Sequence, residues 1–310
     1  MHIISAANDG FIPHFAAMLH SAWLYHPDAN YYLLDAGIAE RNLIRLREFT
    51  ESLGVDLTIF SCDALVNERL PTVKSRAHYV RWLIPELLAN DIERALYLDG
   101  DMTVISSIDE LYGIDLAGRA IAAIENGNPE FSREESAVQG IDFGDDYFNS
   151  GLMVMDLVQW RHDRIADHAF AYAAANHQKL PLYDQSSLNA ILYKRNRKID
   201  PIWNFFRPLE IEKLSGEPRI LHYVSIQKPD RWPESPFADL YKFHRDQTPW
   251  PFQKFAARPW RDARRRIGAS LGIKKYRKKL DVLRKLEDVR VRVTAPALER
   301  AKNLHLQRSR

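Results

Sequence analysis

Short apolar runs alternate with stretches of helical periodicity through the first part of the chain. The runs at 2–7, 31–34 and 55–60 are rich in β-prone residues, and each is long enough for one strand. Between them, apolar residues recur every three or four positions over 13–25 and 39–53, which is the spacing of a helix with one buried face. The pattern therefore predicts the order strand, helix, strand, helix, strand.

The same alternation continues to about residue 223. The further elements that we expect are a helix at 79–88, strands at 95–98, 120–124 and 152–155, helices between 156 and 192, and a short strand at 219–223 within otherwise irregular chain from 201 to 251. Alternation of strands and helices is typical of a mostly parallel sheet that helices cover on both faces. We therefore predict an α/β fold built on a single, mostly parallel sheet.

The last part of the chain has a different composition. Residues 258–310 contain 18 Lys or Arg residues and 5 Asp or Glu residues, whereas the net charge of the whole chain is only +2. Leucine and isoleucine recur between the basic clusters, so this segment is expected to form one or two basic amphipathic helices that Pro296 ends or interrupts. We therefore divide the chain into a body, 1–257, and a basic helical tail, 258–310.

The composition excludes several classes of protein. The single cysteine, Cys62, rules out an internal disulfide and a thiolate metal cluster. The chain starts without a basic segment followed by a long apolar stretch, and no apolar run is long enough for a membrane-spanning helix. We therefore expect a cytoplasmic protein whose tail could bring it to the inner face of the cytoplasmic membrane as a peripheral protein.

Polar side chains follow several of the predicted strands. Asn8, Asp35 and Glu125 each come after an apolar run, and Asp99 and Asp101 follow the run at 95–98. Ligands of open α/β sheets bind beyond the carboxyl ends of the strands, so we expect these side chains to converge on one site. Carboxylate oxygens are ligands for Mg²⁺ or Mn²⁺, although an Asp-Gly pair is also common in ordinary turns.

His222 lies in the predicted strand at 219–223. A single strand histidine is most often a core residue, and its interest here comes from the two carboxylates. Two carboxylates and one imidazole nitrogen favour Mn²⁺ over Mg²⁺, because Mn²⁺ accepts nitrogen ligands more readily.

A set of motifs appears along the chain in one order. They are Ala6-Ala7-Asn8-Asp9, Asp35-Ala36-Gly37-Ile38, Arg81 followed by Leu96-Tyr97-Leu98-Asp99-Gly100-Asp101, Tyr147-Phe148-Asn149-Ser150-Gly151, Asp184-Gln185-Ser186-Ser187-Leu188-Asn189, Trp203-Asn204, and His222-Tyr223 with Lys228-Pro229. In this order they resemble glycosyltransferase family 8, which includes bacterial lipopolysaccharide galactosyl- and glucosyltransferases and, more distantly, glycogenin. The resemblance extends over about residues 1–232.

The resemblance implies a GT-A type nucleotide-diphospho-sugar transferase fold for the catalytic domain, 1–257. It implies a retaining transfer of galactose or glucose from a UDP-sugar to a saccharide acceptor, such as a lipopolysaccharide or another cell-surface glycan, which could be lipid-linked. Mn²⁺, or else Mg²⁺, would be bound by Asp99, Asp101 and His222. The donor would contact Ala6, Asn8, Phe11, Asp99, Gly100, Asp101, Glu125, Asn149, Gly151, Asp184, Gln185 and Lys228, and the residues assigned to catalysis are Asp184, Gln185, Asn149 and Arg81.

The chain departs from the family pattern at a few positions. Asn8 stands where relatives often have Asp, Phe11 where Tyr is common, and Ser225 where Gly is usual. A glycine near a phosphate lets the backbone approach closely, so Ser225 bears on phosphate geometry. The sequence leaves open whether retention proceeds by front-face substitution or by double displacement through Gln185 or Asp184.

Other interpretations remain beside the transferase. The chain could be a catalytically inactive sugar-nucleotide binder that its tail tethers to a membrane. The segment from Asp99 to Val104 also matches the first motif of haloacid-dehalogenase-like phosphatases, and Gly144-Asp145-Asp146 resembles their last motif. The roughly forty residues between them are too few for the strand-helix units of that fold. For the tail, an anionic membrane surface is a better match than nucleic acid, because apolar residues interrupt the charges.

Overall fold

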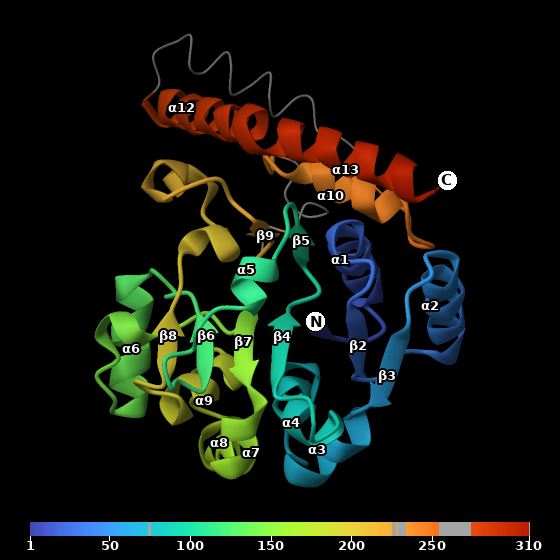
Figure 1. Ribbon diagram of the computed structural model, residues 1–310. Coiled ribbons are helices and arrows are strands. Elements are labelled where there is room, and N and C mark those ends of the chain that lie inside the picture. The colour runs from blue at the N-terminus through green and yellow to red at the C-terminus, as the bar shows by residue number, and fades with distance from the viewer. Residues whose placement is uncertain (74–75, 225–227, 229–233, 254–273, 310) are drawn as a thin grey trace.

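The computed structural model describes residues 1–73, 76–224, 228, 234–253 and 274–309, with backbone only for 274–277. Seven of its strands form one sheet in the order β3-β2-β1-β4-β7-β6-β8 (Figure 1). They are β1 (His2–Ala7), β2 (Asn30–Asp35), β3 (Leu57–Ser61), β4 (Arg94–Leu98), β6 (Ile121–Ala123), β7 (Leu152–Asp156) and β8 (Asn196–Lys198). Ser225 and the basic run at 258–273, both named above, lie outside the described residues.

The sheet is mostly parallel, as predicted, and β7 is its reversed strand. β1 pairs in parallel with β2 and β4, β2 with β3, and β6 with β8, whereas β7 is antiparallel to both β4 and β6. Because β7 is reversed, its first residue Leu152 lies opposite Leu98, the last residue of β4. The backbone N–H of Asp99 consequently donates to the carbonyl of Gly151 at 2.7 Å.

Helices cover both faces of this sheet. Adjacent residues of a strand point to opposite faces, so Ile3 belongs to one hydrophobic cluster and Ile4 to another. The first cluster includes α1 (Ile12–Tyr25) and α2 (Glu40–Ser52), and the second includes residues from α3 (Asp63–Arg69), α4 (Ile84–Leu87), α7 (Leu157–His162), α8 (Ile165–Asn176) and α9 (Tyr183–Ile191). Two further helices, α5 (Asp109–Tyr112) and α6 (Pro129–Gln139), lie between strands in the sequence.

Two expected elements differ in the structure. The single helix predicted at 79–88 is wrong: a 3-10 turn, η2 (Val80–Leu83), precedes the short α4. Pro85 has no N–H for an α-helical bond to the carbonyl of Arg81, so a regular helix cannot run through this point. The predicted strand at 219–223 exists as β9 (Ile220–His222), but it pairs with β5 (Met102–Val104) in a separate small sheet.

The chain from 201 to 251 is also less irregular than its sequence suggests. Short 3-10 turns, η4 (Pro201–Trp203) and η5 (Pro208–Lys213), are followed by the helix α10 (Ala238–Asp246). Leu240, Tyr241 and His244 are the buried residues of α10, and their spacing is helical. The helix is short, and the proline and tryptophan residues around it favour irregular structure, so the sequence pattern did not predict it.

The tail forms the predicted helices. They are α12 (Lys274–Val289), a π-helical segment η7 (Arg290–Thr294) and α13 (Ala295–Arg308). Pro296 lies in the first turn of α13, directly after the π-helical segment, and its missing N–H explains why regular α-helical bonding is interrupted there. None of the described helices combines the length and the apolar character needed to cross a bilayer.

The apolar face of the tail is covered by the body. Val289, Val293, Ala297 and Ala301 are buried in the same hydrophobic cluster as α1. In Figure 1 the two tail helices run across one end of the molecule, next to α10. Burial of these side chains removes apolar surface from water, so the packing stabilises the body as well as the tail.

Candidate active site

Asp99 and Asp101 stand in the turn between β4 and β5, and His222 ends β9. In the small sheet, Met102 is the register partner of His222, and the N–H of Tyr223 donates to the carbonyl of Asp101 at 3.0 Å. This antiparallel pairing brings the histidine beside the two carboxylates although it is distant in the sequence. The three predicted metal ligands are therefore together in the fold.

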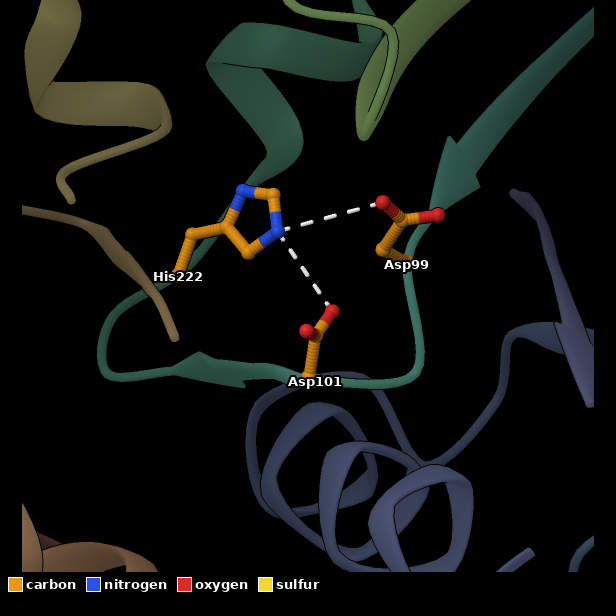
Figure 2. A group of neighbouring side chains, drawn as sticks. All are labelled: Asp99, Asp101 and His222. Carbon is orange, nitrogen blue, oxygen red and sulfur yellow. Dashed lines mark ion pairs between the residues drawn. The ribbon is translucent and has the colours of Figure 1, made fainter. Parts of the chain in front are cut away.

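The imidazole of His222 points at both carboxylates, as Figure 2 shows. Its Nε2 atom is 3.4 Å from Asp101 Oδ1 and 3.8 Å from Asp99 Oδ2. One ligand atom from each residue lies within 4.8 Å of the other two. Two carboxylate oxygens and one nitrogen around a common point form the donor set of a divalent cation.

Two asparagines determine how His222 is oriented. Asn204 Nδ2 donates to Asn149 Oδ1 at 3.0 Å, so Asn204 Oδ1 faces His222 Nδ1 at 2.9 Å and accepts its proton. Asn149 Oδ1 also accepts from the N–H of Gly151 at 3.1 Å. Since Nδ1 is engaged by Asn204, Nε2 is the ring nitrogen that faces the carboxylates, and it is the nitrogen that would bind a metal ion in place of its proton.

Gly151 forms a cradle beside these ligands. A Cβ atom at this position would lie 2.5 Å from His222 Cε1 and 2.7 Å from Asp99 Oδ2, so a larger residue would displace both. Because Gly151 has no side chain, no carbon atom of this residue enters the space among the three ligand atoms. The residues present therefore fit a small divalent cation.

Lys228 contributes positive charge at the edge of the ligand group. Its Nζ atom is 3.0 Å from Asp101 Oδ2 and lies 5.4 Å from the centre of the Phe11 ring. Burial alone would raise the pKa of Asp101, but the hydrogen bond and charge of His222, followed by those of Lys228, lower it below its usual range. Asp101 is therefore a carboxylate at neutral pH.

Arg81 is a buried cation between two acidic groups. Its NH2 atom is 3.1 Å from Asp99 Oδ1, its Nε is 3.1 Å from Asp184 Oδ2, and its NH1 donates to the carbonyl of Ser150 at 2.8 Å. Burial opposes its charge, but Asp184 and then Asp99 outweigh burial and raise the pKa of Arg81. The guanidinium also lies over the Tyr97 ring. Arg81 thus links the turn after β4 to the start of α9.

Asp184 and Gln185 lie in the first turn of α9, and both are buried. Gln185 Oε1 accepts from the N–H of Ser150 at 3.0 Å. Within the described residues, Gln185 Nε2 and Asp184 Oδ2 have no hydrogen bond of good geometry, although Asp184 Oδ2 has its ion pair with Arg81. The preceding Tyr183 has a φ of 46°, a strained value for a bulky side chain. Buried polar atoms without partners are typical of a site that binds a polar ligand.

The remaining predicted donor contacts lie around the start of α1. Ala6 is the last but one residue of β1, and Asn8 Oδ1 accepts from the N–H of Phe11 at 3.1 Å, which helps to start the helix. A Cβ atom on Gly100 would lie 3.3 Å from atoms of Phe11 and Phe15, so this turn packs directly on α1. The first turn of α1 is therefore next to the turn that carries the two carboxylates.

Two of the acidic residues that follow strands serve the backbone instead. Asp35 Oδ1 accepts from the N–H groups of Gly37 and Ile38 at 2.9 and 2.7 Å. Asp9 Oδ1 accepts from the N–H of Ala39 at 2.8 Å and from Asn42. Both carboxylates hold turns at the edge of the sheet, so not every polar side chain at the strand ends joins the ligand group.

A cavity of about 290 Å³ lies beside His222, on the side of Asn204. Phe206, whose ring is 6.1 Å from that of His222, belongs to its wall, and so does Glu125. Glu125, a predicted donor contact, is exposed at the rim of this wall, and partial desolvation of its carboxyl group raises its pKa. The cavity has apolar and charged walls, the combination that binds a sugar ring and its hydroxyl groups.

Sequence reasoning missed the roles of three residues in this region. Tyr97 was assigned to a buried strand, but its hydroxyl donates to Asp99 Oδ1 at 2.8 Å. Asn204 and Ser150 occur in the sequence pattern only as members of motifs, whereas in the fold Asn204 contacts His222, and Ser150 contacts Arg81 and Gln185. A polar residue between two aromatic residues, as in Trp203-Asn204-Phe205, was the one available signal for Asn204.

The sequence and the fold both match known glycosyltransferases. The family model of glycosyl transferase family 8 matches residues 2–234. General stress protein A of Bacillus subtilis is 29% identical over 81% of this chain and 94% of its own length. Lipopolysaccharide 1,2-glucosyltransferase of Escherichia coli is 23% identical over 73% of this chain and 71% of its own length.

Some relatives are longer than the segment that they share with this chain. The chain spans 61% of the length of the glycosyltransferase GlyF of Streptococcus pneumoniae, at 27% identity over 79% of this chain. The galactosyltransferase LgtC, solved with donor and acceptor sugar analogues, has the same fold, with a TM-score of 0.68, 20% identity and coverage of 84% of this chain and 99% of LgtC. Since the family model covers most of the chain, the protein belongs to glycosyl transferase family 8 and is a glycosyltransferase with a GT-A type fold.

Proposed function

We propose that the protein transfers galactose or glucose from a UDP-sugar to a saccharide acceptor with retention of the anomeric configuration. The observation that carries the proposal is the convergence of Asp99, Asp101 and His222 around the space that Gly151 leaves open. The names of two relatives, a lipopolysaccharide 1,2-glucosyltransferase and a lipopolysaccharide 1,3-galactosyltransferase, support the choice of sugar and acceptor.

The three ligands suit Mn²⁺ first and Mg²⁺ second, because one of them is a nitrogen. When bound, such an ion supplies Lewis-acid stabilisation of the diphosphate that leaves the sugar. Lys228 adds a second positive charge at the same edge, 3.0 Å from Asp101 Oδ2. Charge that is already in position when the anomeric bond breaks stabilises the leaving group without reorganisation.

The donor is proposed to extend from the start of α1 to the start of α9. Ala6, Asn8 and Phe11 would contact the uridine, and Gly100 keeps the turn close to this helix. Arg81, Asn149, Gly151, Asp184 and Gln185 would surround the sugar, where the buried polar atoms of Asp184 and Gln185 offer hydrogen bonds to its hydroxyl groups. Front-face substitution and double displacement through Gln185 or Asp184 use this same arrangement.

The acceptor is proposed to enter through the cavity beside Asn204. Its walls bring Glu125 and Phe206 next to the residues that orient His222. A saccharide of a lipopolysaccharide or of another cell-surface glycan, which could be lipid-linked, fits the chemistry of these walls. Aromatic and carboxylate side chains bind the apolar faces and the hydroxyl groups of sugars, respectively.

The tail is proposed to hold the enzyme at the inner face of the cytoplasmic membrane as a peripheral protein. Lys278, Lys279, Arg284 and Lys285 of α12 are exposed, whereas the apolar residues Leu286 and Val289 of the same helix are buried. Such a helix would contact anionic headgroups through charge rather than by inserting apolar side chains. The catalytic domain, 1–257, and the tail, 258–310, would then have separate tasks.

The experiment that tests the function measures nucleotide release. The purified protein is incubated with Mn²⁺ and a panel of nucleotide sugars without acceptor. We expect UDP release from UDP-galactose or UDP-glucose, with a loss of about three orders of magnitude in Asp101→Asn, because the metal and its ligands supply several kcal/mol of transition-state stabilisation.

Asp56→Asn is the matched control, because Asp56 is exposed and lies before β3, away from the turn after β4. It should release UDP at the rate of the unmutated protein. Absence of release from every donor, together with no donor-dependent change in melting temperature, would reject the transferase and favour a protein that only binds.

A further inference from the structure

Two exposed rings stack on each other directly beside Asp184. His78 ends the 3-10 turn η1 (Arg76–His78), and Tyr183 is the first residue of α9. The centres of the two rings are 5.2 Å apart, and the ring planes are inclined by only 18°. The His78 side chain is 46% exposed and Tyr183 is 50% exposed. Since the body does not cover this stack, the edges of both rings can be reached by a ligand.

The backbone holds Tyr183 in a conformation that a bulky side chain disfavours. Its φ of 46° lies in the left-handed region, where the Cβ atom is crowded by the backbone. Hydrogen bonds fix the chain on both sides of it: the N–H of Leu182 donates to Ser186 Oγ at 3.0 Å, and Ser187 Oγ donates to the carbonyl of Tyr183 at 3.1 Å. Backbone strain of this kind is concentrated at sites that bind ligands.

His78 faces the carboxylate of Asp184 without bonding to it. Its Nδ1 atom is 4.0 Å from Asp184 Oδ1, which is too long for a hydrogen bond. The other carboxylate oxygen, Oδ2, is 3.1 Å from Nε of Arg81. In the part of the chain that the structure describes, the ring nitrogens of His78 have no hydrogen bond. A ring nitrogen and a carboxylate oxygen are therefore adjacent, and neither satisfies the other.

The separation of these two atoms suits one hydroxyl group. An oxygen atom at about 2.8 Å from both Nδ1 and Oδ1 would make an angle of about 90° between its two hydrogen bonds, given the 4.0 Å between them. A hydroxyl group can donate to the carboxylate, which only accepts, and accept from the Nδ1–H of the ring at the same time. Hydroxyl groups of this kind are carried by every hexose.

We propose that His78, stacked on Tyr183, is a specificity-determining residue that binds one hydroxyl group of the donor sugar together with Asp184. The inference rests on the proposed function, which places Asp184 beside that sugar. It adds a residue of η1 to those that surround the sugar. A site that bonds a hydroxyl group rejects the analogue without it, because the polar groups of the site are then left unpaired.

The test combines His78→Phe with the removal of single hydroxyl groups from the donor. Phenylalanine keeps a ring that stacks on Tyr183 and removes both nitrogens. We measure kcat/KM for nucleotide release, with Mn²⁺, from the active UDP-hexose and from its four monodeoxy analogues. One analogue should be roughly 30-fold poorer than the parent in the unmutated protein but only about 3-fold poorer in His78→Phe, because the variant has already lost half of the bridge. The ratios for the other three analogues should not change.

His162→Phe is the matched control. His162 Nδ1 also lies beside a carboxylate oxygen, Asp163 Oδ1 at 2.6 Å, but its side chain is 84% exposed at the end of α7. This variant should keep every ratio of the unmutated protein. Isothermal titration of the same donors with Mn²⁺ present gives the corresponding ratios of dissociation constants and does not depend on turnover.

The outcomes separate this inference from the function on which it rests. If the unmutated protein neither binds nor releases nucleotide from any UDP-hexose, the proposed function fails and the role of His78 fails with it. If the protein binds or uses the donor but all four ratios are the same in His78→Phe as in the unmutated protein, only the role of His78 is overturned. A ratio that falls equally in His162→Phe has the same consequence.

Discussion

Two groups of histidines connect distant parts of this chain, and their surroundings are opposite. His222 meets the carboxylates of Asp99 and Asp101. At the junction of body and tail, His20 of α1 has its Nδ1 atom 2.9 Å from Nδ1 of His244 in α10 and its Nε2 atom 3.2 Å from Nδ1 of His305 in α13. Among the described residues, no carboxylate pairs with these three rings.

The difference determines what each group can bind. Burial, followed by the other two histidines, holds the pKa of His20 well below its usual value, and burial lowers the pKa of His244 to about 3. A neutral imidazole donates through one nitrogen and accepts through the other, so His20 can bridge two neighbours. His222, in contrast, has its Nε2 atom facing two carboxylates. One residue type thus serves a cation site or an uncharged contact, depending on the groups around it.

The largest expected effect comes from filling the cradle at the carboxylates. In Gly151→Ala the new Cβ would lie 2.5 Å from His222 Cε1, so the imidazole has to turn away from its position. We expect Mn²⁺ to bind roughly 100-fold more weakly, because reoriented ligands lose metal affinity by one to two orders of magnitude. Isothermal titration with Mn²⁺ measures this directly.

Gly216→Ala is the control, since a Cβ there meets no atom within 4 Å and its backbone φ is not left-handed. Equal Mn²⁺ affinity in Gly151→Ala and the unmutated protein would mean that the three residues do not form the cation site, and the contrast between the two histidine groups would be lost.

The next effect concerns the outer face of the tail. Neutralising Lys278 and Lys285 in one variant should weaken binding to vesicles of anionic lipid by roughly 30-fold, at about 1 kcal/mol for each charge near the surface. Co-sedimentation measures the partition. The variant should keep its melting temperature, since both side chains are exposed while the inner face of the helix stays packed.

Arg133→Gln with Lys179→Gln removes the same charge from exposed positions of the body. If this double variant weakens vesicle binding as strongly as the double variant of the tail, the net charge of the protein, and not the tail, determines the binding. In that case the tail serves only to pack against the body.

The smallest effect is a difference in acid sensitivity. A histidine whose pKa is lowered on folding takes up its proton only in the unfolded chain, so its stability contribution is complete above about pH 6.5 and is lost as the pH falls below it. For His244, with a folded pKa of about 3, the loss is about 1.4 kcal/mol per pH unit. Between pH 7.5 and 5.5, His244→Gln should therefore lose about 1.4 kcal/mol less free energy of unfolding than the unmutated protein, as measured by urea unfolding at the two pH values.

His162→Gln serves for comparison, because the His162 side chain is 84% exposed. The free energy of unfolding of this variant should change between the two pH values as much as that of the unmutated protein. If the free energy of unfolding of His244→Gln changes with pH as much as that of the unmutated protein, the histidines at the junction of body and tail take up protons while folded. That result would contradict the neutral state proposed for them.

The strands and most helices of the body could be predicted because local pattern decides them. The apolar run of β1 and the helical spacing of α1 are each contained in a short stretch of sequence. The helix expected at 79–88 failed at Pro85, whose missing N–H outweighs the apolar spacing around it. The helix α10 was missed because only three of its nine residues are buried, too few for a clear period.

For the site, sequence alone indicated the ligand types but not their arrangement. Asp99 and Asp101 could be recognised from their place after an apolar strand, and the resemblance to a family added His222 and Gln185. The orienting roles of Asn204 and Tyr97 could not be predicted, because a hydrogen bond between residues distant in sequence leaves no local pattern.

What the sequence by itself determined is the alternation of strands and helices, the acidic turn after β4 and the basic tail, since each depends on neighbours within a few residues. The tertiary structure decided the reversal of β7, the β5–β9 pairing that brings His222 to the carboxylates, and the burial of the tail's apolar face on α1. These depend on long-range packing, where the free energy of burying a side chain is set by which distant surface covers it.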